Sequence, residues 1–150
     1  MGKQAIMLFA AALAAALFML GCGGDSASIT KAEFTKQAEA ACKKNEEALQ
    51  KDFQAFVKKH SNVTEPTEAD YAELVGDVFV GNIEAEMKEL RAIEIPSGDE
   101  KQVEALLDAR EESLKKAEAE PEEAITKSEN VFGKASKLAK AYGLEACSQR

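Results

Sequence analysis

Three cysteines and one histidine have the widest chemical repertoire in this chain: Cys22, Cys42, Cys147 and His60. Thiolates act as nucleophiles, bind metals or form disulfides, and an imidazole acts as a general base or a ligand. A zinc site needs several such ligands, and a di-iron bundle needs two Glu-x-x-His motifs, which one histidine cannot supply. The sequence also has no P-loop, dinucleotide fingerprint or Gly-x-Ser-x-Gly elbow. We therefore expect no enzymatic activity, no cofactor and no metal site.

The remaining polar candidates have structural explanations. His60 lies at a predicted helix end, where a capping or solvated role is expected rather than catalysis. An acidic patch surrounds Pro121 but lacks the loop spacing of an EF-hand, so we expect no specific calcium site. This patch consists of Glu118, Glu120, Glu122 and Glu123. Many other glutamates stand four residues before a lysine, an order that favours surface ion pairs.

The surroundings of Cys22 indicate export. Lys3 precedes an apolar stretch of sixteen residues, 5–20, and Gly21 lies directly before Cys22. A secretory signal has this order of a positive start, an apolar core and a small residue at the cleavage point. The stretch is shorter than the roughly 18 residues of a spanning helix. The alternatives are an uncleaved N-terminal helix with an incidental cysteine, and N-myristoylation, whose motif wants Ser or Thr in place of Ile6.

The run Met19-Leu20-Gly21-Cys22 resembles the lipobox of bacterial lipoproteins, in which an aliphatic residue, a small residue and Gly or Ala precede the modified cysteine. Gly21 and Cys22 fit that pattern, whereas Met19 and Leu20 are less common choices. The resemblance implies that a diacylglycerol is attached to the Cys22 thiol and that cleavage after Gly21 makes Cys22 the mature N-terminus. Two acyl chains, such as palmitate, anchor stably, since one chain binds only marginally. The expected location is the extracytoplasmic face of the cell membrane.

The sequence therefore divides into a signal peptide (1–21), a lipidated flexible tether (22–29) and a helical bundle domain (30–150). Removal of the signal from the 150 residues leaves 129, enough for one domain with a core. It also removes a single cation, so the formal net charge changes from −8 to −9. Nucleic acid needs a basic surface, and anionic lipid attracts Lys and Arg, so neither suits this acidic chain. We expect membrane binding through the acyl chains on Cys22, an envelope protein as candidate partner, and no nucleic acid.

Cys42 and Cys147 are predicted to form a disulfide. Export places both thiols in an oxidising compartment, where a leftover free thiol is a liability. The bond would close a loop of about a hundred residues and stabilise the fold by ~4–5 kcal/mol in the chain-entropy treatment. The alternative is that Cys42 is a small core residue and Cys147 a free surface thiol.

Apolar residues recur at helical spacing in four successive segments, and no strand signal is comparable. Pro121 suits the first turn of the fourth segment and Gly143 its end. Capping boxes mark the other three starts: Thr30 with Glu33, Thr67 with Asp70, and Ser97 with Glu100. The sequence predicts an all-α protein, an up-down-up-down four-helix bundle closed by one disulfide.

The first helix is predicted to run from about Lys31 to about Lys59, with an apolar stripe that continues to its end. The last members of this stripe are Leu49, Phe53, Phe56 and Val57. In the second helix, Gly76 and Gly81 permit either a close helix approach or a bend. We expect the Arg110 stem to lie along the seam of the third helix, with its charge reaching solvent. The fourth helix is either continuous across residues 128–130 or broken there.

We expect the protein to be a membrane-anchored extracytoplasmic lipoprotein that acts as a non-enzymatic protein-interaction module of the cell envelope. The alternative is a carrier or sensor that binds an apolar small molecule within the bundle. Its motivation is the pair Gly76 and Gly81, beside Val78, Phe79, Ile83 and Met87, for which ordinary core packing is the simpler interpretation.

The whole chain also resembles small exported lipoproteins of Gram-positive-type bacteria. The shared features are the lipobox, a helix that carries a cysteine, and the closing run Tyr142-Gly143-Leu144-x-x-Cys147. This resemblance implies no particular activity.

Overall fold

The computed structural model describes residues 28–149. The predicted signal peptide, its predicted cleavage point at Gly21 and the predicted lipidation site Cys22 lie outside these residues. All elements of the described part are helical: α1 (Lys31–Lys59), α2 (Glu68–Leu74), the π-helix η1 (Val75–Val80), α3 (Gly81–Ala92), α4 (Glu100–Ala119), α5 (Pro121–Thr126), α6 (Ser128–Tyr142) and the 3₁₀-helix η2 (Ala146–Ser148).

Helix α1 has the bounds that its sequence predicts. The Thr30 hydroxyl accepts a hydrogen bond from the Glu33 amide at 3.2 Å, and the Thr30 amide donates to the Glu33 carboxylate at 2.9 Å. This reciprocal box satisfies two amides that the first turn leaves without helical partners. His60 is the C-terminal cap residue, and Lys58 and Lys59 lie in the last turn, where positive charge suits the helix dipole.

The second predicted helix is three segments. Thr67 and Asp70 form the expected capping box at the start of α2. A π-helix then occupies residues 75–80 before α3 resumes α-helical geometry. Gly76 lies within this segment and Gly81 directly follows it, and no atom lies within 4 Å of a Cβ built at either position. The two glycines therefore do not serve a close approach of helices. Their place in the structure is a change of helix type, from α-helix to π-helix and back.

The start of the third helix was predicted wrongly. Asp99, not Ser97, is the residue before α4, and no side chain caps that end. Glu100 instead accepts a hydrogen bond from the Gly98 amide, at 2.8 Å. Gly98 has a φ of +91°, a left-handed conformation that does not fit a right-handed helix starting directly after Ser97.

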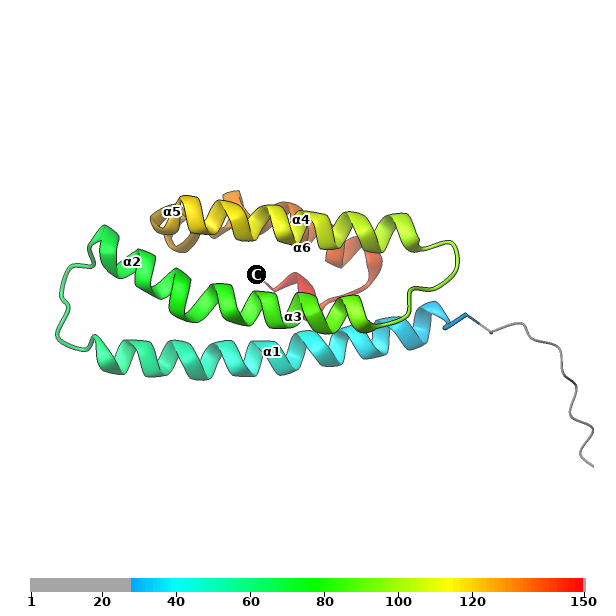
Figure 1. The fold of residues 1–150 in the computed structure, drawn as a ribbon, viewed down its shortest axis with the longest axis horizontal. Helices are drawn as coiled ribbons and strands as arrows, with labels where there is room; N and C mark the ends of the chain where they lie inside the picture. The colour runs from blue at the N-terminus through cyan, green and yellow to red at the C-terminus, as the bar shows by residue number, and fades with distance from the viewer. Residues whose placement is uncertain (1–27, 150) are drawn as a thin grey trace, which may run out of the picture.

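The fourth predicted helix is broken. Pro121 opens α5 as expected, but Lys127 leaves helical geometry with φ −136° and ψ 48° before α6 begins at Ser128. Gly143 ends α6 in the left-handed conformation, with φ 96°, as a C-terminal glycine stop should. The chain then folds back, and η2 lies between the helices (Figure 1).

Two separate apolar cores hold these elements together. Helix α1 packs against α3 and η2, α4 packs against α6, and α2 packs against α5 (Figure 1). The first core surrounds the two cysteines and includes Phe34, Ala38 and Ala41 from α1. The second core consists of Val75, Ile83, Met87, Leu114, Ala117, Ala124, Val131 and Phe132, so α1 contributes no buried residue to it.

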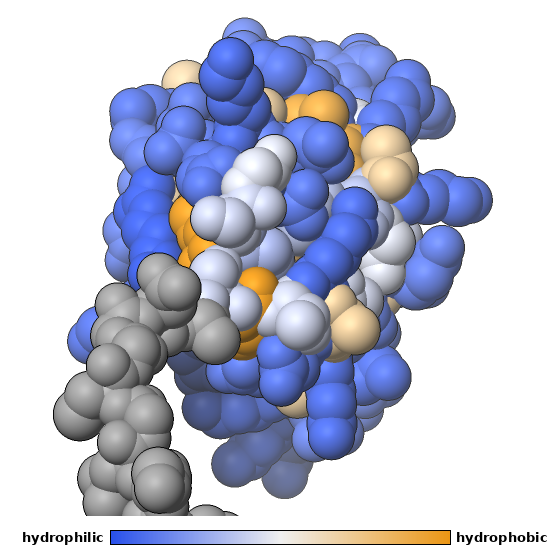
Figure 2. Space-filling view, turned by 90° about the vertical axis from the view of Figure 1, so that its right-hand side faces the viewer, coloured by the Kyte–Doolittle hydropathy of each residue, from blue (hydrophilic) through white to orange (hydrophobic). Residues whose placement is uncertain are grey.

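Hydrophilic side chains cover most of the end of the molecule at which α1 begins (Figure 2). Small, separate apolar areas interrupt this surface. No helix within residues 28–149 is long and apolar enough to cross a membrane.

Candidate functional site

The second half of α1 is not buried, although its apolar stripe continues. Asn45 is the last buried residue of the helix. Phe53 is 42% exposed and Val57 is 50% exposed. The apolar stripe that the sequence shows along the whole of α1 therefore has no fully buried member beyond Asn45. The reason is that η1 and α3 to α6 supply all the buried residues of the second core, and α1 supplies none.

These exposed side chains gather in a groove between α1, α2 and α5. Its outer lobe has a volume of about 460 Å³, and Phe53, Val57 and Val63 all line it. These three are the most exposed large hydrophobic side chains of the described residues. The other lining residues are Phe56, His60, Ser61, Pro66, Asp70, Tyr71, Leu74 and Ile125. Exposed apolar side chains that converge on one concave surface indicate a binding site rather than chance exposure.

An inner lobe of about 400 Å³ continues the groove toward α6. The two lobes share Phe53, Leu74 and Ile125, so they form one elongated cleft. No charged side chain lines the inner lobe, whose remaining residues are Leu49, Phe79, Ile83, Ala124, Ser128, Phe132 and Gln149. Each lobe falls within the roughly 300–1,000 Å³ of ordinary ligand pockets.

The π-helix positions α2 relative to this groove. In a π-helix the hydrogen bonds span five residues instead of four, so η1 shifts the register between α2 and α3. Helix α3 keeps its contact with α1, whereas α2 packs against α5. Segments of this kind often occur at functional sites because they redirect a helix without ending it. The groove lies where α2 separates from α1.

Polar contacts close the outer end of the groove. Lys59 Nζ lies 2.5 Å from Glu73, and His60 Nε2 lies 3.3 Å from the same carboxylate. The His60 ring also stacks on Phe56, with ring centroids 4.2 Å apart. The hydrogen bond with Lys59 holds the pKa of Glu73 below its ordinary value and raises that of Lys59. His60 thus has the predicted helix-end position, and it also forms part of the groove.

A second polar contact holds α1 farther along its length. Asn82 donates hydrogen bonds to Asp52, at 2.9 Å, and to the Val78 carbonyl, at 2.7 Å. The second half of α1 is therefore attached to its neighbours by polar contacts at Asp52 and Lys59, with apolar surface left open between them.

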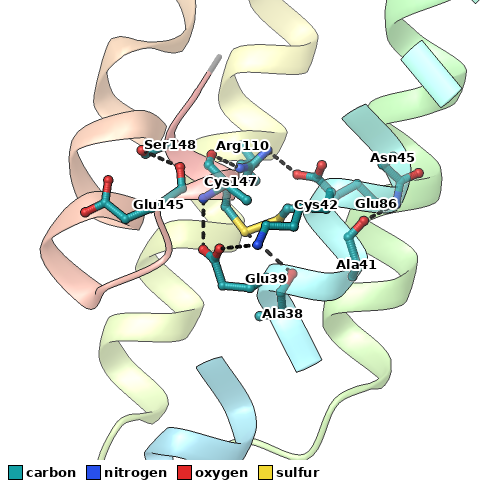
Figure 3. The surroundings of a disulfide bond; sticks show 12 residues. Ala38, Glu39, Ala41, Cys42, Asn45, Glu86, Arg110, Glu145, Cys147 and Ser148 are labelled. Carbon is teal, nitrogen blue, oxygen red and sulfur yellow. Dashed lines mark hydrogen bonds and ion pairs between the residues drawn. A yellow bond between two sulfur atoms is a disulfide. The ribbon is translucent and has the colours of Figure 1, made fainter. Parts of the chain in front are cut away.

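Cys42 and Cys147 lie at disulfide distance, with 2.01 Å between the sulfurs and 5.2 Å between the Cα atoms (Figure 3). This geometry is compatible with the predicted pairing, which would join α1 to η2 across 105 residues. Both cysteines are buried. The Ala146 amide donates to Glu39 at 2.9 Å, which fixes η2 against α1 from a second point.

A buried ion pair lies beside the cysteines. Arg110 Nη1 lies 2.5 Å from Glu86, and Arg110 Nη2 donates to the Cys147 carbonyl (Figure 3). Glu86 is fully buried and Arg110 is only 4% exposed. The expectation that the Arg110 charge reaches solvent is therefore wrong, because Glu86 and the Cys147 carbonyl neutralise it inside the fold. Sequence reasoning missed Glu86, although its position three residues after Ile83 on the apolar face of α3 was a signal.

A larger hollow of about 630 Å³ lies between α3 and α4. Several of its lining side chains are charged and pair with one another. Arg91 lies 2.8 Å from Glu111, which lies 2.9 Å from Lys115. Because these charges already have partners and the surface around them is polar, this hollow is a weaker candidate than the apolar groove.

Among the structurally described residues, no three His, Cys, Asp or Glu side chains are grouped so that they could hold a metal ion. Comparisons with protein-family models, curated proteins and solved structures find no match to this chain. No known relative therefore indicates what the groove or the cysteine region does.

Proposed function

We propose that this chain is a lipid-anchored extracytoplasmic binding protein without enzymatic activity, whose groove receives an apolar small molecule. The observation that carries the proposal is the convergence of Phe53, Val57 and Val63 on one cleft. Of the two functions that the sequence suggests, this geometry favours the carrier over the protein-interaction module. Of the glycines that motivated the carrier, Gly76 lies within η1 and Gly81 directly follows it.

The anchor is proposed from the lipobox-like run that ends at Cys22. Two features support it. The pair Cys42 and Cys147 suits an oxidising compartment. The end of the domain nearest the tether is mostly hydrophilic, so the acyl chains on Cys22 would do the membrane binding (Figure 2). Because α1 has 29 residues and is about 43 Å long, the groove at its far end would be held away from the bilayer.

We further propose that the helical segments form an up-down-up-down four-helix bundle. In this description α2, η1 and α3 together count as the second helix of the bundle, and α5 and α6 together count as the fourth. The contacts of α1 with α3, and of α4 with α6, support this arrangement. The proposed disulfide would join α1, the first helix of the bundle, to the C-terminal tail.

The anchor is tested by Cys22→Ala in cells that express the full chain. We expect the natural protein in the membrane fraction, with a mass that shows cleavage before residue 22 and attached acyl chains. The variant should lose the acyl mass and leave the membrane fraction. Natural protein that keeps Met1 and carries no lipid would contradict the proposed export and membrane anchoring.

The groove is tested with the neutral fluorophore N-phenyl-1-naphthylamine and the double variant Phe53→Asp/Val57→Asp. Both side chains are exposed, so the substitutions should leave the fold intact. Charge inside the groove should abolish the fluorescence increase that the natural chain gives. Ala55→Asp is the matched control, since Ala55 is exposed on the opposite face of the same helix and does not line the groove. Equal fluorescence for all three proteins would refute the groove as an apolar site.

A protein partner remains the second candidate function, because the apolar face of α1 is open along one side. An amphipathic helix of a partner could lie in such a groove. Crosslinking and pull-down with the natural chain and with Phe53→Asp/Val57→Asp would test it. A protein neighbour that depends on the groove residues would favour this second candidate over the carrier.

A further inference from the structure

The polarity of the groove changes along its length. The inner lobe has apolar walls, with Ser128 and Gln149 as its only polar side chains. The outer lobe adds His60, Ser61, Asp70 and Tyr71. On α1 the lining extends from Leu49 to His60, which corresponds to about 16 Å. A ligand that matches both lobes is long, apolar at one end and polar at the other.

The charge at the outer end favours a positive head group. Asp70 is the carboxylate that lines the lobe, and hydrogen bonds from Thr67 hold its pKa below the ordinary value. Its Oδ1 lies 3.9 Å from His60 Nδ1. No lysine of the described residues lines the lobe, and the charge of Lys59 is already paired with that of Glu73 at 2.5 Å. An incoming carboxylate would therefore meet like charge from Asp70, whereas an ammonium would meet opposite charge.

Aromatic rings strengthen the same preference. Phe56 and Tyr71 both line the outer lobe, close in the chain to His60 and Asp70 respectively. Aromatic faces attract quaternary ammonium groups through their negative quadrupole, and a carboxylate gains nothing from them. Carboxylate and rings together form the kind of site that recognises alkylated ammonium.

Resting on the proposed function, we infer that the groove binds a single-chain amphiphile with an ammonium head, its tail in the inner lobe and its head beside Asp70. The two lobes share Phe53, Leu74 and Ile125, so one chain can extend from the outer lobe into the inner lobe. The headgroup chemistry is shared by long-chain alkylammonium compounds and by single-chain lipids with an ammonium headgroup.

The head is tested by calorimetric titration of the mature chain that begins at residue 22, with Cys22→Ser so that no acyl chain is attached. All the contacts described above lie within residues 28–149, which this chain contains. The probes are dodecyltrimethylammonium, dodecanol and dodecanoate, each below its micelle concentration. We expect the ammonium to bind most tightly and the carboxylate most weakly. Asp70→Asn should weaken ammonium binding about two- to fivefold and leave dodecanol unchanged.

Glu68→Gln is the matched control for Asp70→Asn. It removes the same charge from the same first turn of α2, and Glu68 does not line the groove. Equal affinity of the three probes, or equal effects of the two substitutions, would overturn the ammonium inference while the apolar groove stands. If no probe binds, or if the chain dimerises through the groove in light scattering, the proposed function fails as well.

The tail is tested with decyl-, dodecyl- and hexadecyltrimethylammonium. Each buried methylene should increase affinity about fourfold until the chain fills the inner lobe. Ser128 is exposed and lines that lobe, so Ser128→Trp should obstruct it without loss of the fold. We expect the variant to reduce the advantage of hexadecyl over decyl by on the order of tenfold. An unchanged dependence on chain length would overturn the placement of the tail.

Discussion

At the scale of single residues, the most demanding environment in the described structure is that of Glu86 and Arg110. Both are buried, and the Arg110 guanidinium joins a carboxylate of α3 to the backbone carbonyl of Cys147. A buried ion pair contributes little net stability over an apolar pair, but loss of one partner is costly. The pair therefore acts mainly to specify how the C-terminal tail fits between the helices.

We predict that Arg110→Met destabilises the protein by about 3–5 kcal/mol, because Glu86 then loses its cation inside the fold. The double variant Glu86→Leu/Arg110→Met should be considerably more stable than the single variant. Urea denaturation of the three proteins measures both differences. A single variant that loses less than about 1 kcal/mol would show that Glu86 is not held as an ion in the core.

At the scale of elements, the irregular path from α2 to α3 decides where the groove lies. Gly76 lies within η1 and Gly81 directly follows it, both are exposed, and added methyl groups would meet no neighbour. Gly143 is different, because its φ of 96° ends α6. The same residue type thus weakens one element and correctly terminates another.

Gly76→Ala and Gly81→Ala should each raise the free energy of unfolding by up to ~1 kcal/mol, since alanine restricts the unfolded chain and fits helical geometry. Gly143→Ala should lower it by about 1 kcal/mol or more, because alanine is strained at positive φ. Thermal and urea unfolding of the three variants provides the comparison. A stability loss at Gly81 similar to that at Gly143 would mean that the open space beside Gly81 is occupied.

The cysteine pair joins the first element to the last one. We predict that Cys42→Ser/Cys147→Ser lowers the free energy of unfolding by about 2–5 kcal/mol. Mass spectrometry with and without reduction before alkylation should show no free thiol at Cys42 or Cys147 in the natural exported chain. Two alkylated thiols without reduction would rule out the bond.

At the scale of the whole molecule, pairing shifts the titration of many surface groups. Hydrogen bonds lower the pKa of the carboxyl groups of Glu33, Asp70, Glu73, Glu111, Glu112 and Glu123. Glutamate partners raise the pKa of Lys59 and Lys115. Burial, and the hydrogen bond that its hydroxyl donates to Asp99 at 2.7 Å, raise the pKa of Tyr142.

These directions predict a stability plateau with a decline at both ends. As the pH falls below about 4.5, carboxylates of the unfolded chain take up protons before those of the folded chain, so the free energy of unfolding decreases. As the pH rises above about 10, unfolded Tyr142 releases its proton before the folded form does, and stability falls again. Circular dichroism melts from pH 3 to pH 11 measure this profile. Tyr142→Phe should weaken the alkaline decline, and an unaltered decline would contradict the assignment to Tyr142.

Much of the helical structure was predictable from the sequence because its signals are local. The Thr30 and Thr67 boxes, the Pro121 start and the Gly143 stop each act within one helical turn. The start of α4 was not predictable from the same rule, because Gly98 changes the turn geometry before it. The candidate site was predictable only in part. The apolar stripe of α1 is visible in the sequence, but its exposure is not.

Sequence by itself determined an acidic, helical chain with a lipobox-like start and two cysteines suited to pairing. Those properties follow from composition, spacing and hydrogen bonds between near neighbours. Only the tertiary structure decided that Phe53 and Val57 stay exposed and that Arg110 is enclosed with Glu86. The physical reason is that burial depends on which distant elements reach a face: η1 and α3 to α6 complete the second core without α1, and one side of that helix stays open.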